Sequence, residues 1–95
     1  MNGPEMRARR FLAMGKVQGV GFRWFTRRAA SELGVAGRVR NLPDGRVETE
    51  AAGTVDRLDA FREKLQQGPS GSRVTKIEEQ EISPVPDWDG FVIDR

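Results

Sequence analysis

The chain has 95 residues, which suffices for one domain with one modest hydrophobic core. Hydrophobic residues make up 37% and charged residues 32% of the sequence, and the formal net charge is only +2, so the composition is typical of a globular protein and does not favour nucleic-acid binding. Cysteine and histidine are both absent, which excludes disulfides, thiolate ligands, cysteine nucleophiles and histidine general bases.

Neither a membrane span nor a secretion signal is evident in the sequence. No apolar run approaches the roughly 18 residues that a membrane span needs. The first five residues also lack the apolar core of a signal peptide. We therefore expect a cytoplasmic protein in which residues 1–5 form a flexible N-terminal tail and residues 6–95 form a single domain.

The first half of the chain predicts a strand, a helix and a second strand. Residues 7–16 alternate with a period of two, and residues 35–41 do the same. Between them, residues 22–33 form an amphipathic helix that stops at Gly34. Arg27 and Arg28 lie off its apolar face, and we expect them in solvent. The predicted apolar stripe consists of Phe22, Phe25, Ala29 and Leu33.

The residue pattern of a third strand, residues 46–52, predicts how this strand pairs with the second strand. Its apolar phase faces inward, and Glu48 and Glu50 face outward. Bringing the apolar phases of the two strands together sets Arg40 against Glu48 and Arg38 against Glu50, with Val39 opposite Thr49. Opposite charges across a strand pair stabilise a sheet by about 0.2–1 kcal/mol each.

The remaining elements complete an α+β fold. A helix over residues 55–66 begins after the N-cap Thr54, ends at Gly68–Pro69, and has the stripe Val55, Leu58, Phe61 and Leu65. Residues 74–82 are a fourth strand, although Val74 and Ile77 are out of period, and residues 91–93 are a short fifth. Two helices can cover only one face of the sheet. We therefore expect a two-layer sandwich of ferredoxin-like βαββαβ type, with a mainly antiparallel sheet and a short extra C-terminal strand.

The glycine-rich stretch between the first strand and the first helix predicts an anion site. Glycines permit positive φ and a close approach of backbone to ligand. Successive N–H groups in such a loop can converge on an anion, and the helix N-terminus adds partial positive charge. Arg23 follows at once and offers a planar fork of donors suited to phosphate. The spacing fits neither the P-loop nor the dinucleotide-binding fingerprint.

The string Gly15-Lys16-Val17-Gln18-Gly19-Val20-Gly21-Phe22-Arg23 resembles the signature loop of the acylphosphatase family. Its second segment, an asparagine followed by Asp-Gly at the end of the second strand, is similar to Gly37-Arg38-Val39-Arg40-Asn41-Leu42-Pro43-Asp44-Gly45. The resemblance covers roughly residues 7–93 and implies the same fold. It also implies a metal-independent enzyme without a cofactor that hydrolyses acyl phosphates to a carboxylate and inorganic phosphate. The site residues it implies are the backbone amides of Gln18, Gly19, Val20, Gly21, Phe22 and Arg23 for the phosphoryl oxygens, the guanidinium of Arg23 for the same group, and Asn41 for the attacking water.

Three further features are given structural interpretations. We expect Asp44–Gly45 to form the turn that holds Asn41 in place. Trp24 is expected to pack or to contact the rim of the site, without a chemical role. Asp87 and Asp89 lie among prolines and are expected in a turn, not in a cation site.

Two alternatives use the same fold. The RNA-recognition motif shares the order of elements but needs aromatic residues on its central strands, whereas residues 46–52 hold none and include two glutamates. A non-catalytic or specialised acylphosphatase-like domain is the other, as at the N-terminus of the hydrogenase-maturation protein, where it is linked to carbamoyl phosphate. No cysteine-rich segment follows in this chain, which favours a free-standing enzyme. We expect a monomer that binds a small acyl phosphate, and inorganic phosphate as product or inhibitor, but neither nucleic acid nor membrane.

Overall fold

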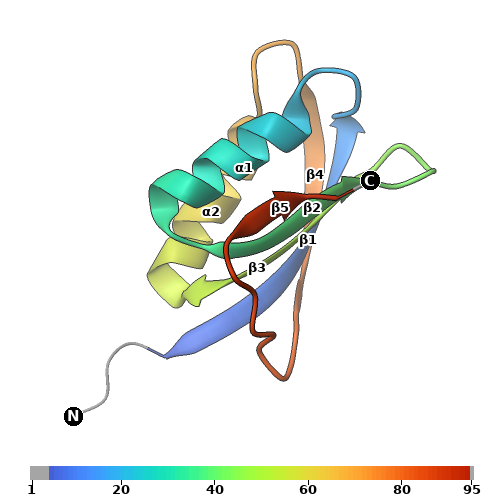
Figure 1. Cartoon of the computed structure of the whole chain (residues 1–95). Coiled ribbons are helices and arrows are strands. Elements are labelled where there is room, and N and C mark those ends of the chain that lie inside the picture. Colours follow the sequence, from blue (N-terminus) through green and yellow to red (C-terminus); the bar gives the residue numbers. More distant parts are fainter. Residues whose placement is uncertain (1–4, 95) are drawn as a thin grey trace.

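Alternating apolar residues and glycine-marked turns build a five-stranded sheet with two helices on one face, seen edge-on in Figure 1. The computed structural model describes residues 5–94, so residues 1–4 of the predicted tail lie outside the described part. The elements are β1 (Met6–Lys16), α1 (Phe22–Leu33), β2 (Ala36–Asn41), β3 (Val47–Thr54), α2 (Val55–Gln67), β4 (Arg73–Glu81) and β5 (Phe91–Ile93).

The strand order confirms the predicted fold. The sheet runs β4-β1-β3-β2-β5, and every neighbouring pair is antiparallel except β2 and β5. Both helices cover the same face, which gives the two-layer α+β sandwich with a short C-terminal strand at one edge (Figure 1). None of the helices in the described part is long and apolar enough to cross a membrane.

The topology brings the two predicted site segments together. Both β1 and β2 pair antiparallel with β3, which lies between them, so they run in the same direction. Their C-terminal ends therefore reach the same edge of the sheet. Ala13 near the end of β1 and Asn41 at the end of β2 both lie opposite Val47. The loop after β1 consequently lies beside Asn41.

The β2–β3 pair has the predicted register, with Val39 opposite Thr49 and the two predicted arginine–glutamate pairs in place. Arg38 Nε donates to Glu50 at 2.7 Å. Glu48 accepts from Arg40 Nε at 2.7 Å and from Arg10 Nε at 2.6 Å. We call the sheet surface turned away from the helices the open sheet face. The side chains that form these hydrogen bonds lie on it, namely Arg10, Arg38, Arg40, Glu48 and Glu50.

Glu48 faces outward as predicted, but its side chain is enclosed, because the residue is only 6% exposed. It does lie on the open sheet face, but the side chains of Arg10 and Arg40 cover it from both sides. Burial acts to raise the pKa of Glu48, yet the hydrogen bonds and charges of the two arginines outweigh burial and hold that pKa below its ordinary value. Glu48 is thus an ionised, enclosed carboxylate.

Three phenylalanines mark the centre of the core between sheet and helices. Phe61 of α2 meets Phe11 of β1 edge-on at 5.9 Å and Phe91 of β5 at 6.0 Å between ring centroids. Phe11 and Phe61 are fully buried. Edge-to-face packing of this kind adds about 0.5–1.5 kcal/mol per pair beyond burial. The short strand β5 is therefore held to the core by a side chain as well as by its pairing with β2.

The buried faces of the helices differ in part from the predicted stripes. In α1, Phe22 and Ala29 are buried as predicted, but Thr26 and Ala30 are buried too, and Phe25 is only half-buried. The Thr26 hydroxyl donates to the Phe22 carbonyl oxygen at 2.8 Å, so this polar group is satisfied inside the core. In α2 the predicted stripe is wrong at its first position, where Val55 is 41% exposed.

An irregularity explains the broken period of β4. Ile77 lies opposite Ala13 and Val74 opposite Gly15, with a shift in register between Met14 and Gly15. One extra residue on β4 at this bulge lets Val74 and Ile77, three positions apart, both pack on the core. A Cβ at Gly15 would overlap the carbonyl oxygen of Arg73. This glycine therefore serves the close approach of β4, not the loop that follows.

Candidate active site

The loop between β1 and α1 is shaped by two glycines with positive φ. Gly19 has φ 74° and Gly21 has φ 77°. A Cβ at either position would meet no atom within 4 Å, so the backbone conformation, and not lack of room, requires glycine. Gly21 is also the N-cap of α1, where no side chain caps the helix and no acidic residue lies in the first turn. The helix thus presents its N–H groups and its partial positive charge to the loop.

Apolar side chains anchor the loop to the core. Val17 and Phe22 are almost fully buried, and Val20 packs against the same core cluster. These anchors alternate with Gln18, Gly19 and Gly21, which face away from the core. The loop is consequently held at both ends and in its middle, as a preorganised anion site requires.

The side chain of Gln18 ties this loop to the β2–β3 turn. Its Nε2 donates to the carbonyl oxygens of Leu42 at 2.8 Å and of Arg46 at 3.0 Å. These carbonyls lie at the two ends of the turn that follows Asn41. Sequence reasoning gave Gln18 only a backbone role and missed this contact, because no local pattern reveals a partner 24 residues away.

The turn itself is built as predicted around Asp44. Gly45 N donates to the Leu42 carbonyl oxygen at 3.1 Å and Leu42 N to that of Arg46 at 2.8 Å. Asp44 accepts from the backbone N of Arg46 at 3.1 Å and from its Nε at 2.8 Å. The backbone hydrogen bond is the main reason why the pKa of Asp44 lies below its ordinary value. A rigid turn therefore follows directly after Asn41.

A cavity of about 90 Å³ gathers most of the predicted site residues. Gln18 and Val20 do not line it, since the Gln18 side chain reaches the turn and Val20 packs on the core. Its lining residues are Val17, Gly19, Gly21, Phe22, Arg23, Trp24 and Asn41. The two motifs that the sequence places apart thus meet at one hollow, at the N-terminus of α1.

Asn41 brings an unpaired acceptor to this cavity. Its side-chain Oδ1 is buried, and no donor in the described part of the chain reaches it. Leaving a buried polar atom unpaired costs about 1–3 kcal/mol. Such an atom is rare in a folded protein, and a catalytic role or a bound water is among the reasons for which one is kept. The Asn41 oxygen is therefore suited to accept a hydrogen bond from a molecule that enters the cavity.

Arg23 lies in the first turn of α1 and is half-buried. It lines the small cavity, and its guanidinium has no ion-pair partner among residues 5–94. Its fork of N–H donors is thus available to an anion beside the helix N-terminus.

Trp24, the next residue, is 67% exposed at the rim of the site, so the predicted rim contact is the one the fold provides. The guanidinium of Arg27 lies 5.6 Å from its ring centroid. Asp87 and Asp89 are exposed and lie outside this cavity. Within the described residues, no three His, Cys, Asp or Glu side chains are grouped so that they could hold a metal ion.

Comparisons with known proteins agree on one family. The family model described as Acylphosphatase matches residues 9–93. An acylphosphatase of Koribacter versatilis (strain Ellin345) is 46% identical over 86 residues, which cover 90% of this chain and 78% of that protein.

Two solved structures extend the comparison to the fold. The acylphosphatase from Bacillus subtilis superposes with a TM-score of 0.91 at 36% identity, covering 96% of this chain and 100% of the other. Full-length HypF, crystallised in a phosphate- and nucleotide-bound form, superposes with a TM-score of 0.88 at 28% identity, but the match covers 99% of this chain and 12% of HypF. The same fold therefore also occurs as a small part of a larger protein. With matched residues that run from β1 to β5 and include both motifs, the chain belongs to the acylphosphatase family.

Proposed function

We propose that this chain hydrolyses the carboxyl–phosphate bond of acyl phosphates, with water as nucleophile, and releases a carboxylate and inorganic phosphate. The observation that carries the proposal is the cavity of about 90 Å³ in which the loop, the N-terminus of α1, Arg23 and Asn41 meet. Membership of the acylphosphatase family supplies the reaction class. The geometry supports a role for each residue.

The phosphoryl group is held by the loop and by Arg23. The backbone N–H groups of residues 18–23 donate to its oxygens, at the positive end of α1. The guanidinium of Arg23 donates two parallel N–H groups to the same oxygens. In a loose phosphoryl-transfer transition state the negative charge is spread over these oxygens, so fixed donors around them lower the barrier.

Asn41 positions the attacking water. Its buried Oδ1 accepts one hydrogen from the water and thereby fixes the oxygen lone pair toward phosphorus. A bond forms from the water oxygen to phosphorus, while the bond from phosphorus to the carboxyl oxygen breaks and its electron pair leaves with the carboxylate. The proton of the water passes to a phosphoryl oxygen or to solvent. An amide accepts a hydrogen bond without taking the proton, so Asn41 acts by position alone.

The leaving group explains why a site without histidine suffices. A carboxylate has a conjugate acid of pKa about 4 and can depart unprotonated at neutral pH. An alkyl phosphate would expel a strongly basic alkoxide and need an acid or a metal. The kcat/KM values should therefore fall steeply from acyl phosphates through aryl phosphates to alkyl phosphates. Equal rates for benzoyl phosphate and an alkyl phosphate would contradict the proposed chemistry.

The decisive experiment is hydrolysis of benzoyl phosphate by the purified protein and by Asn41→Ala, with Gln80→Ala on the exposed surface of β4 as control. We expect Asn41→Ala to lose about 10²–10³-fold in kcat and still to bind inorganic phosphate, because it removes one preorganised group. EDTA should leave the wild-type rate unchanged. A protein that hydrolyses no acyl phosphate, or that needs a divalent ion, would overturn the proposal. We infer further that the enzyme works as a cytoplasmic monomer without a nucleic-acid partner.

A further inference from the structure

A larger groove adjoins the small cavity. It has a volume of about 430 Å³ and lies between α1 and β5. Arg23 and Trp24 line both hollows, whereas Asn41 lines only the small cavity and Arg27 only the groove. The lining residues of the groove are Arg23, Trp24, Arg27, Phe91, Val92 and Ile93. The two hollows are thus neighbours, one narrow and one wide, with Arg23 and Trp24 between them.

In-line displacement fixes which end takes which part of a substrate. The attacking and leaving oxygens lie on opposite sides of phosphorus. If the water is held at Asn41, the acyl group must extend away from Asn41. The groove shares Arg23 with the cavity but does not include Asn41, so an acyl group that extends past Arg23, away from Asn41, would enter it. The narrow cavity is suited to a phosphoryl group and the wider groove to an acyl chain.

The walls of the groove combine apolar surface with positive charge. β5 contributes apolar side chains, and Trp24 offers an exposed indole. Arg27 places its guanidinium 5.6 Å from the centroid of that indole, a cation–π contact that limits its motion. Arg27 has no ion-pair partner in the described part of the chain, and none of the residues that line the groove is acidic.

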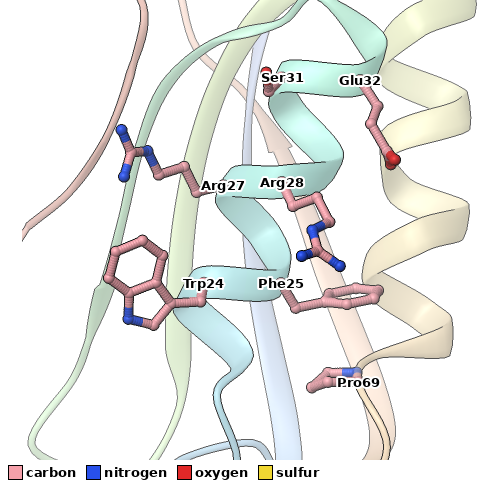
Figure 2. Close-up of a pocket in the computed structure, with 7 residues that line it drawn as sticks. All are labelled: Trp24, Phe25, Arg27, Arg28, Ser31, Glu32 and Pro69. Atoms are coloured by element: carbon pink, nitrogen blue, oxygen red, sulfur yellow. The ribbon is translucent and has the colours of Figure 1, made fainter.

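Two consecutive arginines of α1 point to different surroundings. In Figure 2, the side chain of Arg27 extends on the side of Trp24, whereas that of Arg28 extends toward Phe25. Both arginines line a further hollow on the surface of α1, but only Arg27 also lines the groove. Arg27 is thus the one arginine of this pair that a molecule in the groove would meet.

We propose that the groove is the subsite for the acyl group and that Arg27 recognises a second anionic group at its far end. This inference rests on the proposed function, since the phosphoryl cavity defines the direction of the acyl chain. The preferred substrates are acyl phosphates whose acyl group carries a distal carboxylate or phosphate. Arg27 binds this anion with its charge and its N–H donors, while Trp24 and β5 contact the apolar part of the chain.

The experiment compares 4-carboxybenzoyl phosphate with benzoyl phosphate, which differ by one distal carboxylate. The quantity measured is the ratio of their kcat/KM values for the wild type, for Arg27→Gln and for the matched control Arg28→Gln. We expect the wild type to prefer the carboxylated substrate. Arg27→Gln should reduce the ratio about two- to fivefold, as for a solvent-accessible ion pair, through a higher KM for the carboxylated substrate. Arg28→Gln should keep the wild-type ratio, and added salt should weaken the wild-type preference.

Three results would overturn the inference. The first is that the wild type shows no preference for the carboxylated substrate, and the second is that Arg27→Gln keeps the wild-type ratio. The third is that both variants lose the preference equally, which would mean that the positive charge of α1 as a whole, and not Arg27, attracts the distal carboxylate. In each case hydrolysis of benzoyl phosphate would still support the proposed function. Failure to hydrolyse either substrate would instead contradict that function.

Discussion

The arginines of the open sheet face and those of α1 are the same residue type in opposite situations. On the open sheet face, Arg10 and Arg40 share Glu48, and Arg38 is paired with Glu50, at 2.6–2.7 Å. On α1, Arg23 and Arg27 have no carboxylate partner among the described residues and lie at hollows. The comparison teaches that pairing with a carboxylate commits an arginine to the sheet, whereas an arginine without such a partner that also lies at a hollow has its donors available to a ligand.

The largest difference between the two sets of arginines is expected when one arginine of each set is replaced by lysine. Arg23→Lys should lower kcat/KM for benzoyl phosphate by at least about 10²-fold, because lysine keeps the charge but cannot reproduce the planar fork. Arg38→Lys on the open sheet face is the matched control and should leave the activity unchanged. If the Arg23→Lys enzyme had a kcat/KM for benzoyl phosphate close to that of the wild type, the proposed role of Arg23 in the site would be wrong.

The second prediction concerns stability. Glu48→Ala should lower the free energy of unfolding by about 1–3 kcal/mol, because it leaves the donors of Arg10 and Arg40 without their enclosed acceptor. Glu63→Ala, an exposed glutamate of α2, should cost far less. Urea unfolding measures both, and benzoyl phosphate hydrolysis at a temperature where the variants stay folded should be unaffected. A loss of kcat in a fully folded Glu48→Ala protein would contradict the division between the two sets of arginines.

Much of this division could be predicted from the sequence. The alternation of Arg38, Arg40, Glu48 and Glu50 specified the β2–β3 register, because only one phase brings apolar residues together. The enclosure of Glu48 could not be predicted, since its second partner, Arg10, lies on a strand that is distant in the sequence. The two motifs likewise indicated Arg23 and Asn41 but not which of two neighbouring arginines faces the groove.

Other differences between the predicted and the observed structure also arise from contacts between residues that are distant in the sequence. The periodicity of α1 predicted that Phe25 and not Thr26 would be buried. In the fold, packing on the sheet buries the small Thr26 and leaves Phe25 half-exposed. The bulge in β4 arises from pairing with β1 and is invisible in the local pattern. The side-chain contacts of Gln18 also depend on where the β2–β3 turn lies in space.

The third prediction tests whether that contact of Gln18 holds the two halves of the site in place. Gln18→Ala removes both hydrogen bonds to the turn, so Asn41 and the loop should lose their fixed separation. We expect kcat to fall about tenfold, with a smaller change in KM, because loss of alignment affects the reacting geometry more than phosphate binding. If Gln18→Ala lowers the thermal midpoint and leaves kcat unchanged, the contact is only structural.

The smallest expected effect is the pH dependence that Glu48 adds to stability. The pKa of Glu48 is lower in the folded protein than its ordinary value, because the hydrogen bonds from Arg40 and Arg10 outweigh burial. Protons therefore bind more tightly to the unfolded chain at this position. The stabilisation is fully present above the ordinary glutamate pKa of about 4.3 and is lost as pH falls through the lower, folded-state value.

The difference in unfolding free energy between the wild type and Glu48→Gln should accordingly be constant from neutral pH down to about 5 and shrink below about 4. Glu63→Gln provides the baseline for an exposed glutamate, and its difference from the wild type should change little over the same range. If the Glu48→Gln difference grew on acidification, Glu48 would have to be protonated in the folded protein, and its two arginines would not form the ionic cluster that distinguishes the open sheet face from α1.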